Sequence, residues 1–260
     1  NRLLVTRCLI LALLVVAALA GLEAPASARR VSDAAMLYFA SDNLAPTDAT
    51  SPSWAWDDIS VSGTALTAIS CDDCISPAVP LGFTFTFYGA AYTQIYAASN
   101  GFITLLAGSG APYPGVAIPT ATVPNAYVAP YWTDLIVGAI PVRYQTLGAA
   151  PDRRFVITYD QWGCYAVAGS LRTFQVVFFE TTNMIEVRYQ TNPSCSTRMA
   201  TAGIENTAGT DGIAWSVGAG IVIADLTVVR YSADRDGDGI PDLTDLCPDD
   251  PVAAHQDPAV

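Results

Sequence analysis

The sequence predicts an all-β protein, an antiparallel sandwich of two sheets with an irregular acidic loop appended at its C-terminus. Two observations predict the sandwich: many short runs of β-branched and aromatic residues are separated by turn residues, and no run has the period of an amphipathic helix. The loop is predicted because five regularly spaced aspartates follow the last strand-like run. We therefore expect about a dozen strands in two layers around one apolar core.

Composition sets limits on size and partners. The chain has 260 residues, of which 52% are hydrophobic and 14% charged, enough for one large domain and an appendage. Its formal net charge is -12, and all 12 basic residues are arginines. So few scattered cations exclude a nucleic-acid partner and a basic surface for membranes.

The first residues have the pattern of a secretory signal peptide. An apolar run follows Arg7, and Ala26-Ser27-Ala28 forms a small-residue cleavage site, so residues 1–28 are predicted to be removed. A membrane anchor is the alternative, but the run is short for a span of about 20 residues. No later segment is apolar enough to cross a bilayer, so we expect a secreted or cell-surface protein.

The next segment, residues 29–62, is predicted to be an irregular entry with one short strand near Trp54 to Val61. From residue 63 to 233 we predict the sandwich. Phe83 to Phe87 alternates phenylalanine with threonine, which places the rings on one face of a strand. Asn100-Gly101 joins two β-rich runs and favours a two-residue hairpin turn.

The remaining runs complete the sandwich after a Pro- and Gly-rich loop at residues 107–125. Thr173 to Glu180 is apolar on both faces, which predicts a strand covered on both sides, and Met184 to Gln190 is its expected hairpin partner. In that partner Glu186 and Arg188 are predicted to face outward. Further strands are expected at Tyr92 to Ser99, Phe102 to Leu106, Tyr127 to Leu135, Pro141 to Leu147, Arg154 to Trp162, Thr201 to Glu205, Ile213 to Val217 and Ile221 to Tyr231.

Five cysteines follow the predicted signal peptide, and export favours disulfides between them. Cys164 and Cys195 bracket two strand-like runs and form the first expected pair, worth roughly 3 to 4 kcal/mol in the chain-entropy model. Cys71 and Cys74 form the second, because the aspartates between them disfavour a redox or zinc role. The partner of Cys247 is expected outside these pairs.

The predicted sandwich contains six short motifs: Gly82 to Gly89, Ser99 to Thr104, Ala129 to Asp134, Phe155 to Trp162, Thr173 to Val177 and Ala202 to Ile204. Over roughly residues 80–217, these motifs and their order resemble nidogen-like extracellular domains. The resemblance implies an extracellular module of matrix or surface proteins, and it implies no catalysis.

The aspartates after the last strand have the spacing of a calcium loop. They occupy the first, third, fifth, ninth and twelfth places of a twelve-residue window, with Gly239 at the sixth. A hard divalent cation would convert their mutual repulsion into metal–oxygen contacts. An acidic linker is the alternative, but charge alone would not require the glycine. We expect direct coordination by Asp234, Asp236, Asp238 and Asp245, a carbonyl oxygen from Ile240, and Asp242 directly or through water.

This tail also resembles the thrombospondin type 3 repeat, whose fixed positions are all met from Asp234 to Pro248. The resemblance implies calcium binding and disulfides between consecutive repeats. An EF-hand or dockerin needs a helix after the twelfth place, which Pro248 and Pro251 exclude. We therefore assign residues 234–260 to one repeat of this kind. We expect the chain to be truncated, with further repeats beyond it and Cys247 joining one of them; a single vestigial repeat is the alternative.

Catalysis is not expected. The only histidine, His255, lies in the Pro-rich tail, and no G-x-S-x-G motif occurs. The candidate carboxylates form no recognisable pair for glycoside hydrolysis. The candidates are Asp57, Asp58, Asp134, Asp160, Glu180, Glu186 and Glu205. A second ion site is a further hypothesis, drawing on Asp57, Asp58, Asp72, Asp73 and Asp134.

The expected function is structural or adhesive. Calcium would make the acidic repeat a rigid spacer, while the sandwich contacts matrix or a protein partner outside the cell. The alternative is a carbohydrate-binding module that tethers a larger exported enzyme, with tryptophans as a stacking platform for a glycan, although most are expected to fill the core. The tryptophans are Trp54, Trp56, Trp132, Trp162 and Trp215.

Overall fold

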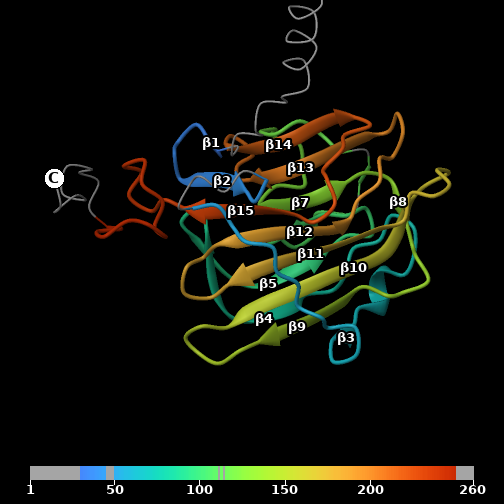
Figure 1. The fold of residues 1–260 in the computed structure, drawn as a ribbon, viewed down its shortest axis with the longest axis horizontal. Helices are drawn as coiled ribbons and strands as arrows, with labels where there is room; N and C mark the ends of the chain where they lie inside the picture. Colours follow the sequence, from blue (N-terminus) through green and yellow to red (C-terminus); the bar gives the residue numbers. More distant parts are fainter. Residues whose placement is uncertain (1–29, 45–49, 111, 114, 250–260) are drawn as a thin grey trace, which may run out of the picture.

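The computed structural model describes residues 30–44, 50–110, 112–113 and 115–249. The predicted signal peptide and the end of the tail, residues 250–260, lie outside the described part. Within the described part, no helix is long and apolar enough to cross a membrane. Apart from one 3-10 turn at Thr67–Ile69, the regular structure of that part consists of β-strands (Figure 1).

Nine strands form the larger sheet, and all its strand pairs are antiparallel. Its strand order is β1-β2-β15-β12-β11-β10-β9-β3, and β8 pairs with one end of β10. The bounds are β1 (Arg30–Ser32), β2 (Tyr38–Asp42), β3 (Thr64–Ala65), β8 (Leu135–Ile136), β9 (Arg143–Leu147), β10 (Arg154–Cys164), β11 (Arg172–Phe179), β12 (Ile185–Thr191) and β15 (Thr227–Ala233).

The smaller sheet has six antiparallel strands in the order β14-β13-β7-β6-β5-β4. In the view of Figure 1, its strands β4 and β5 lie behind β10 and β11 of the larger sheet. The bounds are β4 (Val79–Phe87), β5 (Ala90–Ala97), β6 (Ile103–Thr104), β7 (Tyr127–Trp132), β13 (Met199–Glu205) and β14 (Gly212–Ala219).

The main core lies between the two sheets and is built by the strand alternation that the sequence predicts. Phe83, Phe85 and Phe87 of β4 are buried in it, and the Phe85 ring meets Phe178 of β11 edge-on at 5.1 Å between centroids. Each sheet also has apolar residues on its outer face, where a loop covers them. Ile59 packs on Val156 and Val177 outside the larger sheet.

The two-sheet sandwich is confirmed, and so are the hairpin of β11 with β12 and the pairing of β5 with β6 across Asn100-Gly101. The tight turn there uses positive φ only at Gly101, which has φ 76°, whereas the sequence pattern admits it at both residues. Both predicted disulfides, Cys71–Cys74 and Cys164–Cys195, are present.

The entry segment differs from its prediction in two ways. Residues 30–42 contain β1 and β2, which extend the larger sheet beyond β15, and no strand forms between Trp54 and Val61. Residues 50–63 instead cross the outer face of the larger sheet, in front of β12, β11 and β10 (Figure 1). We call residues 50–63 the strap. Sequence alternation does not detect it, because its contacts are with residues distant in the chain.

The strap changes the environment of β12. Glu186 and Arg188 point to the outer face as predicted, but they are buried, with 3% and 4% of their surfaces exposed. Arg188 Nη2 lies 2.7 Å from Glu186 Oε2, and Nη1 lies 2.9 Å from Asp57 Oδ2 of the strap. Glu186 also accepts hydrogen bonds from Arg230 of β15. The ion pairs therefore hold the strap on the sheet.

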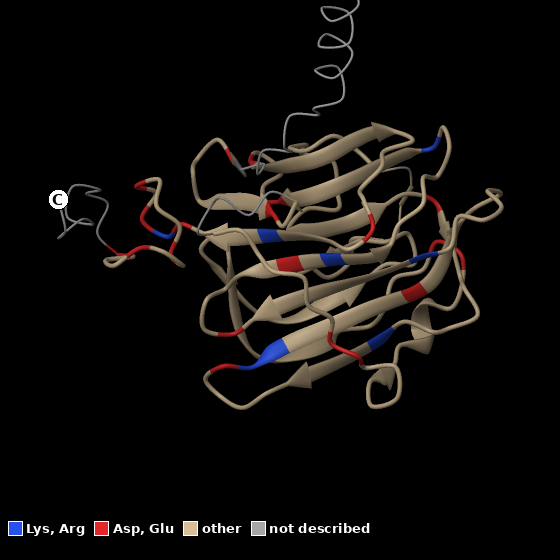
Figure 2. Cartoon of the chain, in the orientation of Figure 1, with Lys and Arg blue, Asp and Glu red and all other residues tan. Residues whose placement is uncertain are grey.

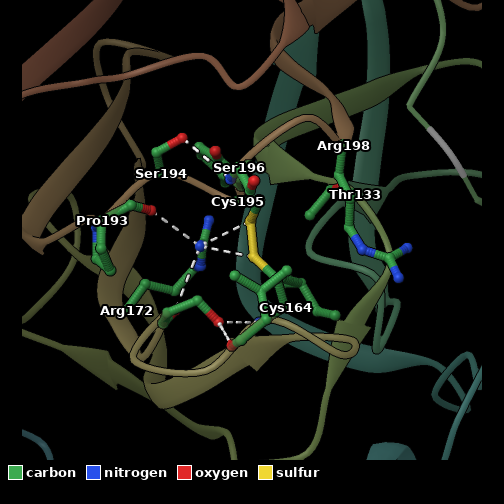
Figure 3. Close-up of a disulfide and its surroundings, with 12 residues drawn as sticks. Thr133, Cys164, Arg172, Pro193, Ser194, Cys195, Ser196 and Arg198 are labelled. Atoms are coloured by element: carbon green, nitrogen blue, oxygen red, sulfur yellow. Dashed lines mark hydrogen bonds between the residues drawn. A yellow bond between two sulfur atoms is a disulfide. The ribbon is translucent and has the colours of Figure 1, made fainter.

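The Cys164–Cys195 disulfide joins the end of β10 to the segment between β12 and β13 (Figure 3). Arg172 of β11 is fully buried beside it and donates from Nη2 to the Sγ atoms of Cys164 and Cys195, each at 2.8 Å. Its guanidinium lies over the Tyr131 ring at 4.0 Å. Burial lowers the pKa of Arg172. The arginine thus links the disulfide to the core between the sheets.

Candidate metal centre in the acidic tail

The acidic loop begins where β15 ends, and it contacts the sandwich. Asp234 N–H donates to the carbonyl of Leu37 at 2.9 Å, and Asp242 N–H donates to that of Ala233 at 2.8 Å. These bonds fold residues 234–242 back against the end of the sheet. In Figure 2, acidic positions, coloured red, are concentrated along this loop, beside the body of the sandwich.

The loop is shaped by its own aspartates and glycines. Asp234 is fully buried, and its two carboxylate oxygens accept hydrogen bonds from the backbone N–H groups of Gly237 and Gly239, both at 2.9 Å. These glycines have φ angles of 73° and 93°, which side chains rarely adopt. The motif therefore requires glycine at its sixth place, Gly239, because the backbone there has a positive φ.

Further turns fix the other carboxylates. Asp236 Oδ1 accepts from Asp238 N–H at 3.3 Å, and Asp238 Oδ1 accepts from Ile240 N–H at 2.8 Å. In each of these residues the second oxygen, Oδ2, is buried and has no hydrogen-bond partner among the described residues. Asp245 repeats the arrangement, with Oδ1 bound to Cys247 N–H and Oδ2 buried without a partner.

Asp234, Asp236 and Asp238 have the geometry of a cation site. One carboxylate oxygen from each lies within 4.8 Å of the others, and within the described residues no other acidic, histidine or cysteine cluster is so close. Because calcium binds oxygen at about 2.3 to 2.6 Å, two ligands of one ion lie at most about 5 Å apart. An oxygen that accepts one hydrogen bond keeps a lone pair for a metal. An all-oxygen donor set with unsatisfied buried oxygens suits a hard divalent cation.

The other predicted ligands have different positions. Asp242 accepts from Arg235 N–H at 2.8 Å and forms an ion pair with its side chain, so it lies outside the three-carboxylate cluster. Asp245 is also outside the cluster, although its buried oxygen lacks a hydrogen bond. The carbonyl of Ile240 stays a predicted ligand. Arg235 was not among the predicted functional residues, and its place between Asp234 and Asp236 was the available sequence signal for an ion pair.

Burial affects the protonation of the site. It raises the pKa of Asp234 to about 6, and the neighbouring Asp236 carboxylate adds to this increase. Burial also raises the pKa of Asp242, while Arg235 acts in the opposite direction. Burial raises both pKa values because a buried negative charge is poorly solvated.

The other candidate sites separate in the structure. Asp57 binds Arg154 and Arg188 of the larger sheet, and Asp134 forms an ion pair with Arg198, so the acidic residues proposed for a second ion site are not one cluster. Of the five tryptophans, Trp132, Trp162 and Trp215 are buried in the apolar clusters, as expected for most of them. Only Trp54 and Trp56 are partly exposed, and they stack on each other with centroids 6.1 Å apart.

Comparison with known proteins identifies the sandwich. Among curated proteins and among solved structures, no significant match to the chain is found. The family model described as NIDO-related matches residues 48–222, which include the strap and most strands of both sheets. Because this match spans more than half of the 260 residues, the chain belongs to the NIDO-related family.

Proposed function

We propose that this protein is a secreted or cell-surface calcium-binding structural protein. The acidic tail would bind Ca²⁺ and become a rigid spacer, as in a thrombospondin type 3 repeat, while the sandwich contacts matrix or another extracellular partner. One observation carries the calcium proposal: Asp236 and Asp238 each keep a buried, unpartnered carboxylate oxygen beside the Asp234 carboxylate.

Export is supported by three independent features. The sequence begins with a predicted signal peptide at residues 1–28. The sandwich is a nidogen-like, NIDO-related domain, which is an extracellular kind of module, and both of its cysteine pairs form disulfides. Outside the cell, calcium is present at millimolar concentration, so a site with a dissociation constant on the order of 0.1 to 1 mM would be occupied there.

A non-catalytic role is part of the proposal. Three of the candidate carboxylates are engaged in structural contacts: Glu180 pairs with Arg153, Glu186 pairs with Arg188, and Glu205 accepts a hydrogen bond from Thr120 N–H. An acid and a base for glycoside hydrolysis must instead face one substrate bond together.

Isothermal titration with calcium tests the proposal. We expect the whole chain to bind with a dissociation constant on the order of 0.1 to 1 mM, as extracellular calcium modules do. The double variant Asp236→Asn/Asp238→Asn should lose this binding. Asp72→Asn/Asp152→Asn removes two exposed carboxylates elsewhere and should bind like the wild type. Absence of heat up to several millimolar calcium, or unchanged binding by the first variant, would contradict the proposal.

A further inference from the structure

A groove of about 270 Å³ lies on the outer face of the larger sheet, beside the strap. Thr158 and Asp160 of β10, Gln175 of β11 and Gln190 of β12 form its floor, and Trp56 of the strap lines it as well. The groove does not lie between the two sheets, so it is separate from the apolar core. It is open to solvent on the outer face of the larger sheet, where a large ligand can reach it.

The aromatic wall of the groove is preorganised. Trp56 is partly exposed and stacks on Trp54 with an angle of 18° between the ring planes. The next residue, Asp57, is fixed to the sheet: Gln175 Nε2 donates to its carbonyl, and its N–H donates to Gln175 Oε1. Ile59, two residues further, is buried on Val156 and Val177. A ring held this way loses little freedom when a ligand stacks on it.

Strap and sheet are also joined at the ends of the crossing. At its start, the Thr50 carbonyl accepts hydrogen bonds from Ser41 Oγ and from Arg230 Nη1. At its end, the Gly63 carbonyl accepts from Arg143 Nη1 at 2.7 Å. The groove is therefore bounded by a segment that is tied down along its length, and its shape does not depend on a ligand.

The polar lining offers hydrogen bonds without a dominant charge. Among the described residues, the Asp160 carboxylate receives a side-chain hydrogen bond only from Thr173, at Oδ1, which leaves Oδ2 for a ligand. The amide of Gln190 is exposed. Arg143 and the carboxylates of Asp58 and Asp160 bring both signs of charge to the lining. This combination suits a ligand that is polar without being strongly charged.

We propose that this groove binds a neutral oligosaccharide chain. The face of Trp56 would stack on the C–H face of a sugar ring, whose hydrogens carry partial positive charge that the π-system attracts. Asp160 and Gln190 would accept from and donate to hydroxyl groups of the sugar. The proposal rests on the proposed role of the sandwich as a contact surface, and it does not rest on calcium binding.

Affinity electrophoresis of the whole chain tests the proposal, in EDTA, through gels that contain a β-glucan, a xylan, a mannan or a galactan. At least one neutral polysaccharide should retard the wild type. Trp56→Ala should weaken the interaction about tenfold or more, as expected for an aromatic anchor, and Gln190→Ala severalfold. Tyr113→Ala removes an exposed aromatic outside the groove and should have no effect.

Gln190→Ala keeps the proposal testable if Trp56→Ala does not fold, because Gln190 is exposed and packs in no apolar cluster. Absence of retardation by all four polysaccharides would overturn the proposal, and so would retardation that both variants retain. Stronger retention by polygalacturonate than by any neutral polysaccharide would overturn it as well. EDTA removes calcium from the gels, so the electrophoresis tests oligosaccharide binding independently of calcium binding. Either test can fail while the other succeeds.

Discussion

At the scale of single residues, a chain of buried charges connects the strap to the sheet. Arg188 lies between Asp57 and Glu186, and Arg230 lies on the other side of Glu186. Such a network contributes little net stability compared with apolar residues of the same volume, but removal of one member leaves the others buried without compensation. We infer that its role is to position the strap.

Arg188→Ala is therefore expected to lower the free energy of unfolding by about 3 kcal/mol, the lower end of the range for a broken buried ion pair. It removes the cation that Asp57 and Glu186 share and leaves each carboxylate with one arginine, Arg154 or Arg230. Urea denaturation followed by tryptophan fluorescence measures this loss. Arg153→Ala, which breaks the more exposed pair with Glu180, is the control and should cost much less. Equal losses in the two variants would show that the network does not act as described.

Glu205 provides a pH-dependent contribution to stability. Burial raises the pKa of Glu205 to about 7 from its ordinary value of 4.5, although Thr120 N–H donates to it at 2.6 Å. The folded state therefore binds the proton more tightly than the unfolded state. This contribution is present below about pH 4.5 and is lost as pH rises to about 7.

Unfolding in urea at several pH values between 4.5 and 8 measures this contribution. Glu205→Gln should make the decline of stability with rising pH less steep than in the wild type, because the amide does not ionise. Identical pH profiles for the two proteins would contradict the assignment to Glu205. Comparison of the two proteins removes the contributions of the other carboxyl groups.

For single residues, the sequence predicted to which face of a strand a side chain points, but it did not predict whether that side chain is buried. Alternation correctly placed Glu186 and Arg188 on the outer face of β12, because successive side chains of a strand point to opposite faces. Their burial depends on the strap, whose Asp57 lies 131 residues before Arg188 in the chain. No local pattern contains that information.

At the scale of elements, the turn between β5 and β6 depends on the glycine of Asn100-Gly101. A Cβ atom on Gly101 would lie 2.5 Å from the Tyr131 carbonyl oxygen and 2.7 Å from Leu135 Cδ1. Asn100 also holds the turn in place, because its Oδ1 accepts a hydrogen bond from Leu135 N–H and its Nδ2 donates one to Asp73 Oδ1. The turn thus joins β5, β7 and β8.

Gly101→Ala should destabilise the protein by more than the roughly 1 to 2 kcal/mol that a left-handed backbone alone costs a side chain. Gly108→Ala is a matched control, because Gly108 has φ 77° but a Cβ atom there would meet nothing within 4 Å. The midpoint of thermal unfolding compares them. Equal decreases would mean that the predicted clash is relieved at no cost.

The sequence predicted the long strands well because their faces alternate between core and surface. It missed β1 and β2 because they are short, and because Tyr38–Asp42 does not alternate: four of its five residues are buried. Their pairing partner, β15, is distant in the chain. In the tail, the motif predicted the cluster of Asp234, Asp236 and Asp238, but it did not predict that Arg235 engages Asp242.

At the scale of the whole molecule, the acidic tail is continuous with the sandwich. The N–H of Asp234 is bound to Leu37, which precedes β2, and the loop folds against the end of β15. A cation bound by Asp234 would therefore stabilise the sheet edge and the loop together, provided that the two unfold as one unit.

We expect about 5 mM calcium to raise the free energy of unfolding of the sandwich by about 1 to 2 kcal/mol, from mass action at a dissociation constant near 0.5 mM. The five tryptophans all precede the tail, so their fluorescence in urea reports on the sandwich itself. Asp236→Asn/Asp238→Asn should show no calcium effect. If calcium binds by titration but leaves the tryptophan transition unchanged, the tail and the sandwich unfold independently.

The most direct test of the calcium site is a crystal structure of the whole chain grown with calcium, with an anomalous difference map. We predict a peak bound by Asp234, Asp236 and Asp238, with oxygen distances of about 2.3 to 2.6 Å. The map also decides whether Asp242, Asp245 and the carbonyl of Ile240 complete the coordination. A calcium-saturated crystal without a peak among these three carboxylates, or with calcium bound only elsewhere, would contradict the account.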